Sequence, residues 1–403
     1  CYTAAPVNAP RQPVGRRARL TVFLTILLDL IGFGMILPLL PFYAERFQAT
    51  PFQIGLLFTS YSLTQLVFAP MLGRLSDRVG RRPLLLASIT GSVAAYLLFA
   101  MAPSYGVLLF ARSLSGLAAS NYGIAQAYMA DVSAPGERSK AMGLVGAAFG
   151  MGFVLGPALG GILAQAGNPR IVPLTAAMLS CLNLFVAFFG LPESLSPEVR
   201  GRAVRGSWFG WSDLAVVWRD SPLRGLMLLF FLVMFCFSMM EATLALFCEK
   251  RYGFGFRQTS WLFVYVGVIL VIVQGGLLGR LVKRYGERSL ILWGIVLMAV
   301  GLAILPLSQL WILLVSLGLL AVGQGMHNPS SLGLLSRLTD KSAQGSTIGL
   351  SRSFGALARA LGPAAGTFLF GAAGAAWPFW TAGGLMVVAL FIALGVLRQV
   401  TIV

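Results

Sequence analysis

Two carboxyl groups lie inside long apolar stretches of the chain: Asp29 in LLDLIGFGMILPLLP and Glu241 in FSMMEATLALF. A charged side chain at the centre of a membrane helix costs about 2.5–3.5 kcal/mol on insertion scales, so it usually has a partner or a function. Loss of hydration also favours the protonated form of a carboxyl group. Asp29 could therefore carry a proton, or it could form a structural ion pair with Arg112 or Arg359. Glu241 could bind a proton or a cationic substrate, or it could simply reach the outer interface.

Polar side chains on other apolar stretches form a second group of candidates. Arg112 shares one helical stripe with Ser115, Ala119, Tyr122 and Gln126. A polar stripe on an apolar helix is expected to face a water-filled cavity, although its serine could instead bond a neighbouring helix. Arg352 and Arg359 lie seven residues apart on one face; the first can reach the cytosol, whereas the second lies near mid-membrane. The expected substrate cavity includes Asp29, Arg112, Tyr122, Gln126, Glu241 and Arg359.

A further candidate is the run His327-Asn328-Pro329 inside another apolar stretch. Proline removes a backbone hydrogen bond and commonly kinks a helix. We therefore expect this point to interrupt the helix and to add His327 and Asn328 to the cavity, with a satisfied structural histidine as the alternative. His327 is the only histidine, and the four cysteines form no C-x-x-C pair. We therefore expect no metal site, no disulfide framework and no catalytic triad, and the chain is not expected to be an enzyme.

The elements that must position these residues are membrane-spanning helices. The chain is 57% hydrophobic and only 11% charged, whereas about a quarter of the residues in a soluble domain are charged. Apolar stretches of roughly 20 residues, the length that crosses a bilayer as a helix, recur throughout, and their continuous rather than alternating pattern excludes a barrel. We expect an all-α polytopic protein with twelve spans, at about 20–42, 52–72, 83–102, 105–130, 140–166, 171–191, 223–248, 257–280, 289–307, 310–335, 346–371 and 376–397.

The distribution of basic residues predicts the topology. A net charge of +17 would suggest nucleic acid in a soluble protein, but in a membrane protein Lys and Arg collect on cytoplasmic loops. With the N-terminus inside, the tails, the even-numbered loops and the linker hold 22 of the 30 basic residues. Both termini of this multi-pass cell-membrane protein are therefore expected in the cytoplasm. The expected organisation is a tail at 1–19, six-helix bundles at 20–191 and 223–397, a cytoplasmic linker at 192–222 and a tail at 398–403.

Sequence patterns recur along the chain at one spacing. GRLSDRVGRR at 73–82 and GRLVKRYGER at 279–288 are 206 residues apart, and so are LGPALGG and LGPAAG, and the GL pairs at Gly143 and Gly349. Matches at a single offset indicate an internal duplication. Membrane carriers are often built from such repeats, so we expect two parallel six-helix halves.

These motifs resemble those of the major facilitator superfamily, specifically its twelve-helix drug:proton antiporters such as the tetracycline exporters. The pattern G-x-L-x-D-R-x-G-R-R at Gly73–Arg82 is the most recognisable signature of that superfamily. LLFARSLSGLAAS resembles its R-x-x-x-G element, with Ser115 in place of the usual glutamine, and GFVLGPALGG resembles the G-x-x-x-G-P-x-x-G-G element associated with antiporters. Asp29 with its two following prolines is typical of the drug exporters, and LPES at 191–194 ends the sixth helix as in relatives. The resemblance implies the major facilitator fold, two pseudo-symmetric six-helix bundles.

The resemblance also implies that the loop at 73–82 belongs to a cytoplasmic gate. Asp77, Arg81 and Asp131 would latch the two halves together on that side, stabilising the outward-open state and separating when the halves rock. The expected gate residues are Gly73, Asp77, Arg78, Gly80, Arg81 and Asp131. Short cytoplasmic loops also collect arginine without any such role. The second copy of the loop is expected to be degraded, because Lys283 replaces the aspartate.

Glycines and a proline define a conformational motif in the fifth helix. Small residues allow helices to pack closely in a membrane, and proline distorts a helix. A rocking interface between the halves would need both, whereas simple tight packing is the alternative. The residues of this motif and of its repeat are Gly152, Gly156, Pro157, Gly160, Gly161, Gly362 and Pro363.

The chain contains no G-x-x-x-x-G-K-[ST] phosphate loop, so transport is expected to be secondary, without a cofactor, and driven by a gradient, which the resemblance implies is the proton gradient. The resemblance implies proton-coupled export of small amphipathic, drug or tetracycline-like compounds by alternating access, with Asp29, Glu241 and Arg112 in proton coupling. A symporter or facilitator for an organic anion, sugar or other metabolite is the alternative. RSFGALARALGP also resembles tetracycline-transporter-like proteins of animals, which favours anionic substrates. The expected partners are the substrate, protons and membrane lipid, with no nucleic acid, and the protein is expected to be a monomer.

Overall fold

The computed structural model describes residues 16–133, 137–195, 221–307, 309–339 and 344–399, and all regular elements in these ranges are helices. The expected linker at 192–222 lies mostly outside them. The first half contains α1 (Arg16–Ile36), α2 (Leu40–Glu45), α3 (Pro51–Val79), α4 (Arg81–Met101), α5 (Tyr105–Ala118), η1 (Ala119–Asn121), α6 (Tyr122–Asp131), α7 (Arg138–Leu163), η3 (Ala164–Ala166) and α8 (Ile171–Gly190). The second half contains α10 (Ser221–Tyr252), α11 (Phe256–Val271), the π-helical η4 (Ile272–Leu277), α12 (Leu278–Ile304), α13 (Leu310–Leu338), α14 (Gln344–Ala372) and α15 (Trp377–Gln399).

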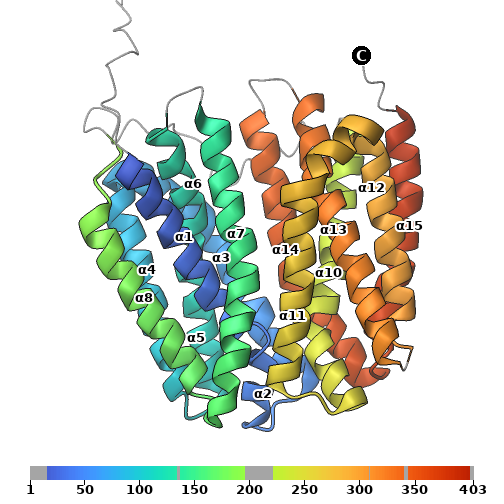
Figure 1. Ribbon diagram of the computed structural model, residues 1–403, viewed down its shortest axis with the longest axis horizontal. Coiled ribbons are helices and arrows are strands. Elements are labelled where there is room, and N and C mark those ends of the chain that lie inside the picture. The colour runs from blue at the N-terminus through green and yellow to red at the C-terminus, as the bar shows by residue number, and fades with distance from the viewer. Residues whose placement is uncertain (1–15, 134–136, 196–220, 308, 340–343, 400–403) are drawn as a thin grey trace, which may run out of the picture.

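The expected all-α fold with twelve crossings is confirmed. Nine described helical segments are long and apolar enough to cross a membrane, and one of them, Phe256–Ile304, contains two crossings that meet at Gly286. The helix formed by α5, η1 and α6 and the helix α14 complete the twelve. The helices run up and down side by side, with α1 beginning and α15 ending at the same end (Figure 1). We call this end the terminal face and the opposite end the distal face.

Prolines interrupt the helices in one place and not in another. The first expected span divides into α1 and α2, with a turn at Leu37–Leu39 next to Pro38 and Pro41. By contrast, α13 continues through Pro329, so the expected interruption after His327 is wrong. Membrane helices tolerate proline because neighbouring groups and local adjustments satisfy the freed carbonyl.

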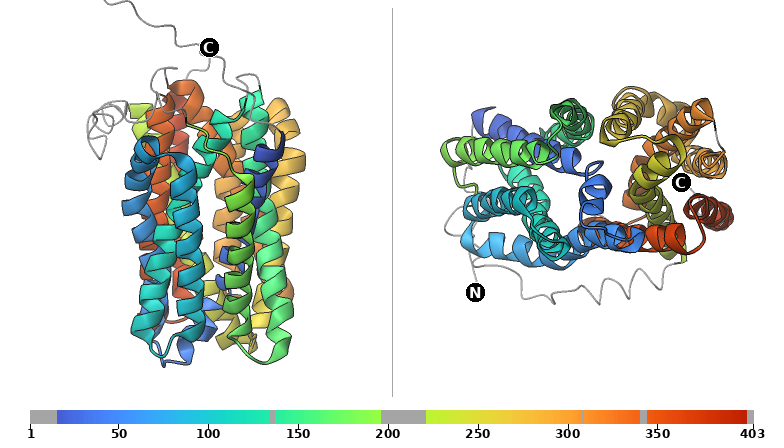
Figure 2. Two further views of the ribbon diagram at one scale, coloured as in Figure 1. Left: turned by 90° about the vertical axis from the view of Figure 1, so that its left-hand side faces the viewer. Right: turned by 90° about the horizontal axis from the view of Figure 1, so that it is seen from below.

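Seen along the helix axes, the two halves form separate groups (Figure 2). In the first half α1 packs against α7 and α8, and α3 packs against α5; in the second, α10 packs against α14 and α15, and α12 packs against α13. Two helix pairs make most of the contact between the halves: α3 with α14, and α7 with α11. The interface is therefore built from four helices, and the fifth-helix glycine motif lies on one of them.

The glycines of α7 place it between α1 and α11. A Cβ on Gly152 would lie 2.4 Å from the Cβ of Leu30, and one on Gly156 would lie 2.7 Å from the Ile31 carbonyl oxygen, both on α1. One on Gly161 would lie 2.9 Å from the Cβ of Ser260 on α11.

The rest of the motif makes equivalent contacts, in the first half through Pro157 and Gly160 and in the second half through Gly362 and Pro363. The Pro157 ring lies against Gly34 of α1, while Gly160 faces both Met35 and Phe256. A Cβ on Gly362 would lie 2.7 Å from the Phe235 carbonyl oxygen on α10, and the Pro363 carbonyl lies against Gly55 of α3. In each half, the motif therefore serves packing within the half and contact with the other half.

Gly156→Ala is expected to destabilise the protein, because its methyl group would meet backbone atoms of α1 that cannot move independently. Overpacking of this kind costs about 1–3 kcal/mol, which should lower the melting temperature in detergent. Gly384→Ala on α15 is the matched control, because nothing lies within 4 Å of its Cβ position. Equal melting temperatures for the two variants would contradict the packing described for α7.

Candidate functional site

Asp29 is held by amide groups rather than by a cation. The Asn121 side chain on η1 donates to one carboxylate oxygen at 2.9 Å, and the Asn183 side chain on α8 donates to the other at 3.0 Å. Asn183 also donates to the Thr25 carbonyl at 3.1 Å. Among the described residues Asp29 has no ion pair within 4 Å, so the alternative of a structural ion pair is not observed. Sequence reasoning missed both asparagines, although Asn183 is the lone amide of its apolar helix.

Arg112 is buried between α5 and α3, with 2% of its surface exposed. Its guanidinium carbon lies 4.7 Å from the ring centroid of Tyr61, and its Nε donates to the Leu57 carbonyl at 3.4 Å. A cation over an aromatic face is stabilised by the negative charge density of the ring. Gly116, one turn after Arg112, allows α3 to approach, because a Cβ there would lie 2.2 Å from the Tyr61 carbonyl oxygen. The R-x-x-x-G spacing therefore places Arg112 over the ring of Tyr61 and Gly116 against the backbone of Tyr61.

The second half contributes Arg359 from α14 and Glu241 from α10 to the centre of the protein. These two charges lie within electrostatic reach of each other, but no ion pair within 4 Å joins them. Arg359 is also close enough to interact electrostatically with Tyr61 and Tyr122 of the first half. Tyr61 in turn lies within electrostatic reach of Asp29. The structure thus brings five of the expected cavity residues into one central group: Asp29, Arg112, Tyr122, Glu241 and Arg359.

Gln126 lies at the edge of this group and bonds across the interface. The Arg352 guanidinium on α14 donates a hydrogen bond to its amide oxygen. Sequence reasoning expected Arg352 to reach the cytosol and did not foresee this link between the two halves. The seven-residue spacing between Arg352 and Arg359 could have indicated this position, because it places both guanidinium groups on one face of α14.

His327 packs against α12, and among the described residues no hydrogen bond or ion pair is seen between His327 or Asn328 and the central group. His327 is 2% exposed and lies against α12, where a Cβ on Gly294 would come within 2.9 Å of the histidine Cβ. Its Nε2 lies 3.3 Å from the Ser331 hydroxyl oxygen. Asn328 is partly buried, and its side-chain oxygen has no partner among the described residues. The alternative of a structural histidine describes this position better than the expected place in the cavity.

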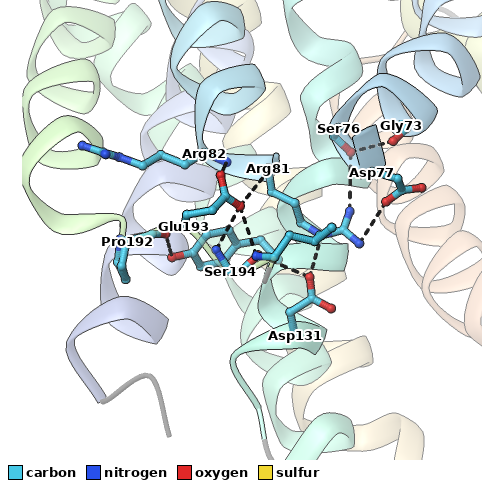
Figure 3. A network of polar contacts seen from close by, with 11 residues as sticks. Gly73, Ser76, Asp77, Arg81, Arg82, Asp131, Pro192, Glu193 and Ser194 are labelled. Atoms are coloured by element: carbon cyan, nitrogen blue, oxygen red, sulfur yellow. Dashed lines mark hydrogen bonds and ion pairs between the residues drawn. The ribbon is translucent and has the colours of Figure 1, made fainter. Parts of the chain in front are cut away.

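The expected gate residues form an ion-pair network within the first half (Figure 3). Arg81 lies 3.1 Å from the Asp77 carboxylate and donates through Nε to Asp131 at 2.5 Å. Ser194 donates to the same oxygen of Asp131 at 3.3 Å. All four residues belong to the first half, and no described ion pair joins them to the second. The latch between the halves therefore stays a prediction for another conformation.

Glu193, in the LPES segment, caps the first turn of α4. Its carboxylate accepts hydrogen bonds from the backbone amides of Arg81 at 3.0 Å and Arg82 at 3.2 Å, and from Leu195 at 3.1 Å. An acid at a helix N-terminus satisfies free amides and the helix dipole. Gly80 has φ +118°, and a Cβ there would lie 2.4 Å from the Glu193 carboxylate. The sequence showed the glycine and the acid separately but not their contact.

Of the remaining expected gate residues, Gly73 lies at the edge of the network and Arg78 is exposed. The Gly73 carbonyl accepts a hydrogen bond from the Ser76 hydroxyl at 2.6 Å, and that hydroxyl accepts one from Arg81 at 3.5 Å (Figure 3). Nothing lies within 4 Å of a Cβ built on Gly73, so its contact is made by the backbone alone.

The second copy of the loop departs from the motif at Val282 and Lys283, as expected, but it keeps the turn and reverses the charges. Gly286 has φ +76°, so it makes a left-handed turn as Gly80 does. Glu287 lies 3.6 Å from Arg337, and these residues follow Arg81 and Asp131 by the same 206 positions. The turn and the ion pair are therefore both conserved between the halves with opposite signs, and Lys283 in place of the aspartate belongs to the same reversal.

A cavity of about 230 Å³ lies between the halves at the distal face. It is lined by Glu45, Ala49, Pro51, Ile54, Leu246, Glu249, Lys250 and Phe370. Loss of hydration and the facing carboxyl group of Glu249 raise the pKa of Glu45 to about 7. Lys250 is directed over the Phe370 ring, 5.7 Å from its centroid. Two acids from opposite halves thus meet where the halves are in contact.

Comparison with known proteins agrees with this architecture. The family model of the Major Facilitator Superfamily matches residues 22–279 and 258–401. The chain belongs to the Major Facilitator Superfamily. It is 31% identical to the class E tetracycline resistance protein of Escherichia coli, over 93% of this chain and 94% of that protein, and 33% identical to the class G protein of Vibrio anguillarum, over 91% and 93%. The crystal structure of the human organic anion transporter MFSD10 (TETRAN) superimposes with a TM-score of 0.72 at 28% identity, covering 95% of this chain and all of that one.

A more distant structural relative shares the fold. The nucleoside transporter NupG superimposes with a TM-score of 0.76 at 13% identity, which supports the fold alone. The expected resemblance to tetracycline efflux proteins is confirmed, and so is the expectation that the chain is a transporter rather than an enzyme.

The reversed ion pair predicts the outcome of a charge exchange in the second half. Glu287→Arg and Arg337→Asp should each reduce transport several-fold, because each places like charges together. The triple change Lys283→Asp, Glu287→Arg, Arg337→Asp should recover most activity, since it reproduces the polarity of Asp77, Arg81 and Asp131. Transport and surface expression are measured together, and a triple variant no better than either single variant would refute the equivalence.

The facing acids predict that the distal contact depends on pH. A carboxyl group whose pKa is raised from 4.5 to about 7 binds its proton best in this conformation, so the contact is fully favoured below about pH 4.5, weakens as pH rises to 7 and changes little above 7. Labelling of Ala49→Cys by an impermeant thiol reagent, relative to Gln309→Cys, should therefore increase as pH rises from 4.5 to 7 and then level off. Glu45→Gln should remove the dependence and Glu137→Gln, on the terminal face, should not. A flat profile in the unaltered background would contradict the assignment.

Proposed function

We propose that this protein is a proton-coupled exporter of small amphipathic compounds that works by alternating access. Asp29 carries the proton, and the substrate binds among the central residues between the two halves. The observation that carries the proposal is the environment of Asp29. Its carboxylate is buried within a membrane helix and contacts two neutral amides, so no fixed positive charge prevents it from taking up a proton.

The substrate is proposed to carry a negative group. Arg359 and Arg112 lie in the central group without a carboxylate partner within 4 Å among the described residues. Arginine is well suited to bind carboxylates through its planar fork of donors. The tetracycline resistance proteins and the organic anion transporter among its relatives agree with such a substrate. A facilitator or symporter for an organic anion uses the same arginines and is the second candidate.

Alternating access is supported by the uneven packing of the interface. Toward the distal face the four interface helices are in backbone contact at Gly55 and Gly161, whereas Gly143 and Gly349 near the terminal face have nothing within 4 Å of a Cβ. We propose that the terminal face is cytoplasmic, as the basic residues predict. The structure then corresponds to a state open to the cytoplasm.

Purified protein in liposomes with an internal pH-sensitive dye tests the proposal. Anionic and zwitterionic compounds, tetracycline included, should drive proton movement, and cationic drugs should drive less. Asp29→Asn should abolish proton movement, because an amide cannot exchange a proton, while substrate binding to detergent-solubilised protein is retained. Adding Asn328→Asp to Asp29→Asn should not restore proton movement, because an acid at position 328 does not replace the acid at position 29. Substrate uptake without proton movement in the unaltered protein would favour the facilitator instead.

A further inference from the structure

Several glycines near the terminal face lie in helices yet contact nothing. Nothing lies within 4 Å of a Cβ built on Gly73 of α3, Gly143 and Gly146 of α7, Gly275 and Gly276 of η4, Gly279 of α12 or Gly349 of α14. A glycine inside a helix costs about 0.5–1 kcal/mol relative to alanine. These seven glycines lie on α3, α7, α14 and the continuation of α11 through η4 into the start of α12. Gly123 of α6 and Gly395 of α15 have equally open surroundings but lie outside these helices. The positions of the seven are explained if another helix approaches them in a second conformation.

The contact already formed by α3 and α14 identifies the partner of Gly73. Near the distal face Gly55 lies against Thr367, where a Cβ would come within 1.9 Å of the threonine oxygen. From there Gly73 is 18 residues along α3, and Gly349 is 18 residues back along α14. Eighteen residues are five helical turns, so each glycine lies on the same side of its helix as the residue in contact, about 27 Å away. Extension of this antiparallel contact therefore brings Gly73 to Gly349.

The contact of α7 with α11 identifies the partner of Gly143 in the same way. Gly161 lies against Ser260 and Gly150 against Val271. From the first of these contacts Gly143 is 18 residues back along α7, and Gly279 is 19 residues forward. The additional residue is accounted for by η4, because a π-helical turn adds one residue to a helix.

The internal duplication independently yields the same pairing. Gly279 follows Gly73 by 206 positions, and Gly349 follows Gly143 by 206. If each residue of the pair Gly73–Gly349 is replaced by its equivalent in the other half, the result is the pair Gly279–Gly143. Two separate routes, helix register and internal symmetry, lead to the same two pairs.

We propose that Gly73–Gly349 and Gly143–Gly279 are the two backbone contacts that close the terminal face when the transporter opens to the distal side. The inference rests on the proposed alternating access and adds the residues that meet. Closure continues the existing contacts α3–α14 and α7–α11 along the same helix faces. Each half supplies one glycine to each contact, as a two-fold arrangement requires.

Cysteine pairs test the proposal without any substrate. In a background without the native cysteines, Gly73→Cys with Gly349→Cys and Gly143→Cys with Gly279→Cys should form disulfides on oxidation, since a disulfide needs Cα atoms within about 7 Å. The exchanged pairs, Gly73→Cys with Gly279→Cys and Gly143→Cys with Gly349→Cys, are the matched controls and should stay reduced. Crosslinking is read as protection from a thiol-reactive polyethylene glycol on a gel. Absence of crosslinks in the first two pairs, or equal crosslinking in the controls, overturns the proposal.

Bulky substitutions provide a second test with a different readout. Gly143→Leu and Gly349→Leu should leave expression and melting temperature unchanged, because their side chains enter open space here, yet should reduce transport at least tenfold. Gly384→Leu on α15, where nothing lies within 4 Å of a Cβ either, should keep full transport. Unchanged transport in the first two variants would refute the contacts. Because the crosslinks need no substrate, their failure is distinguishable from failure of the proton measurement.

Discussion

The structure depends on the close backbone approach that glycine allows along α7. Lipid gives helices no hydrophobic reason to associate, so membrane helices associate through van der Waals contact and hydrogen bonds. At Gly156 the backbone of α7 touches α1 of its own half, and at Gly161 it meets α11 of the other. One helix is thus an integral part of its bundle and also a surface against which the opposite bundle moves. Any side chain larger than hydrogen at Gly156 or Gly161 would push α7 away from α1 or from α11.

The charges inside the membrane differ in kind from those of the loops. At the terminal face Arg81 pairs with Asp77 and Asp131, and Arg337 pairs with Glu287. In the centre, Asp29 is bound by amides and Arg112 lies on an aromatic ring. Neutral partners solvate a charge in a medium of low polarity without fixing it permanently. The loops therefore hold the architecture in place, while the centre keeps charges that a proton or a ligand can still neutralise.

Helix positions and the duplication could be predicted from the sequence because both are periodic: apolar length reports a crossing, and a constant offset reports a repeat. Contacts between helices distant in the chain carry no such periodicity. The amides of Asn121 and Asn183 on Asp29, and the capping of α4 by Glu193, depend on how bundles assemble. Proline at 329 was misleading because its effect depends on neighbouring helices that the sequence does not reveal. His327 was misplaced for the same reason, since a helix has two buried faces and the sequence does not say which one meets the cavity.

The reversed signs at Glu287 and Arg337 also bear on how this protein can be rebuilt. The two halves share one backbone plan, and the duplicated segments can be aligned without a gap between 73–82 and 279–288. A chimera that exchanged these loops would retain the left-handed glycine turn but would set acid against acid and base against base. A reversal of charge at one member of such a pair keeps the ion pair only if the other member is reversed as well. The two halves therefore share the same turn but carry opposite charges around it, so the loop of one half cannot replace the loop of the other.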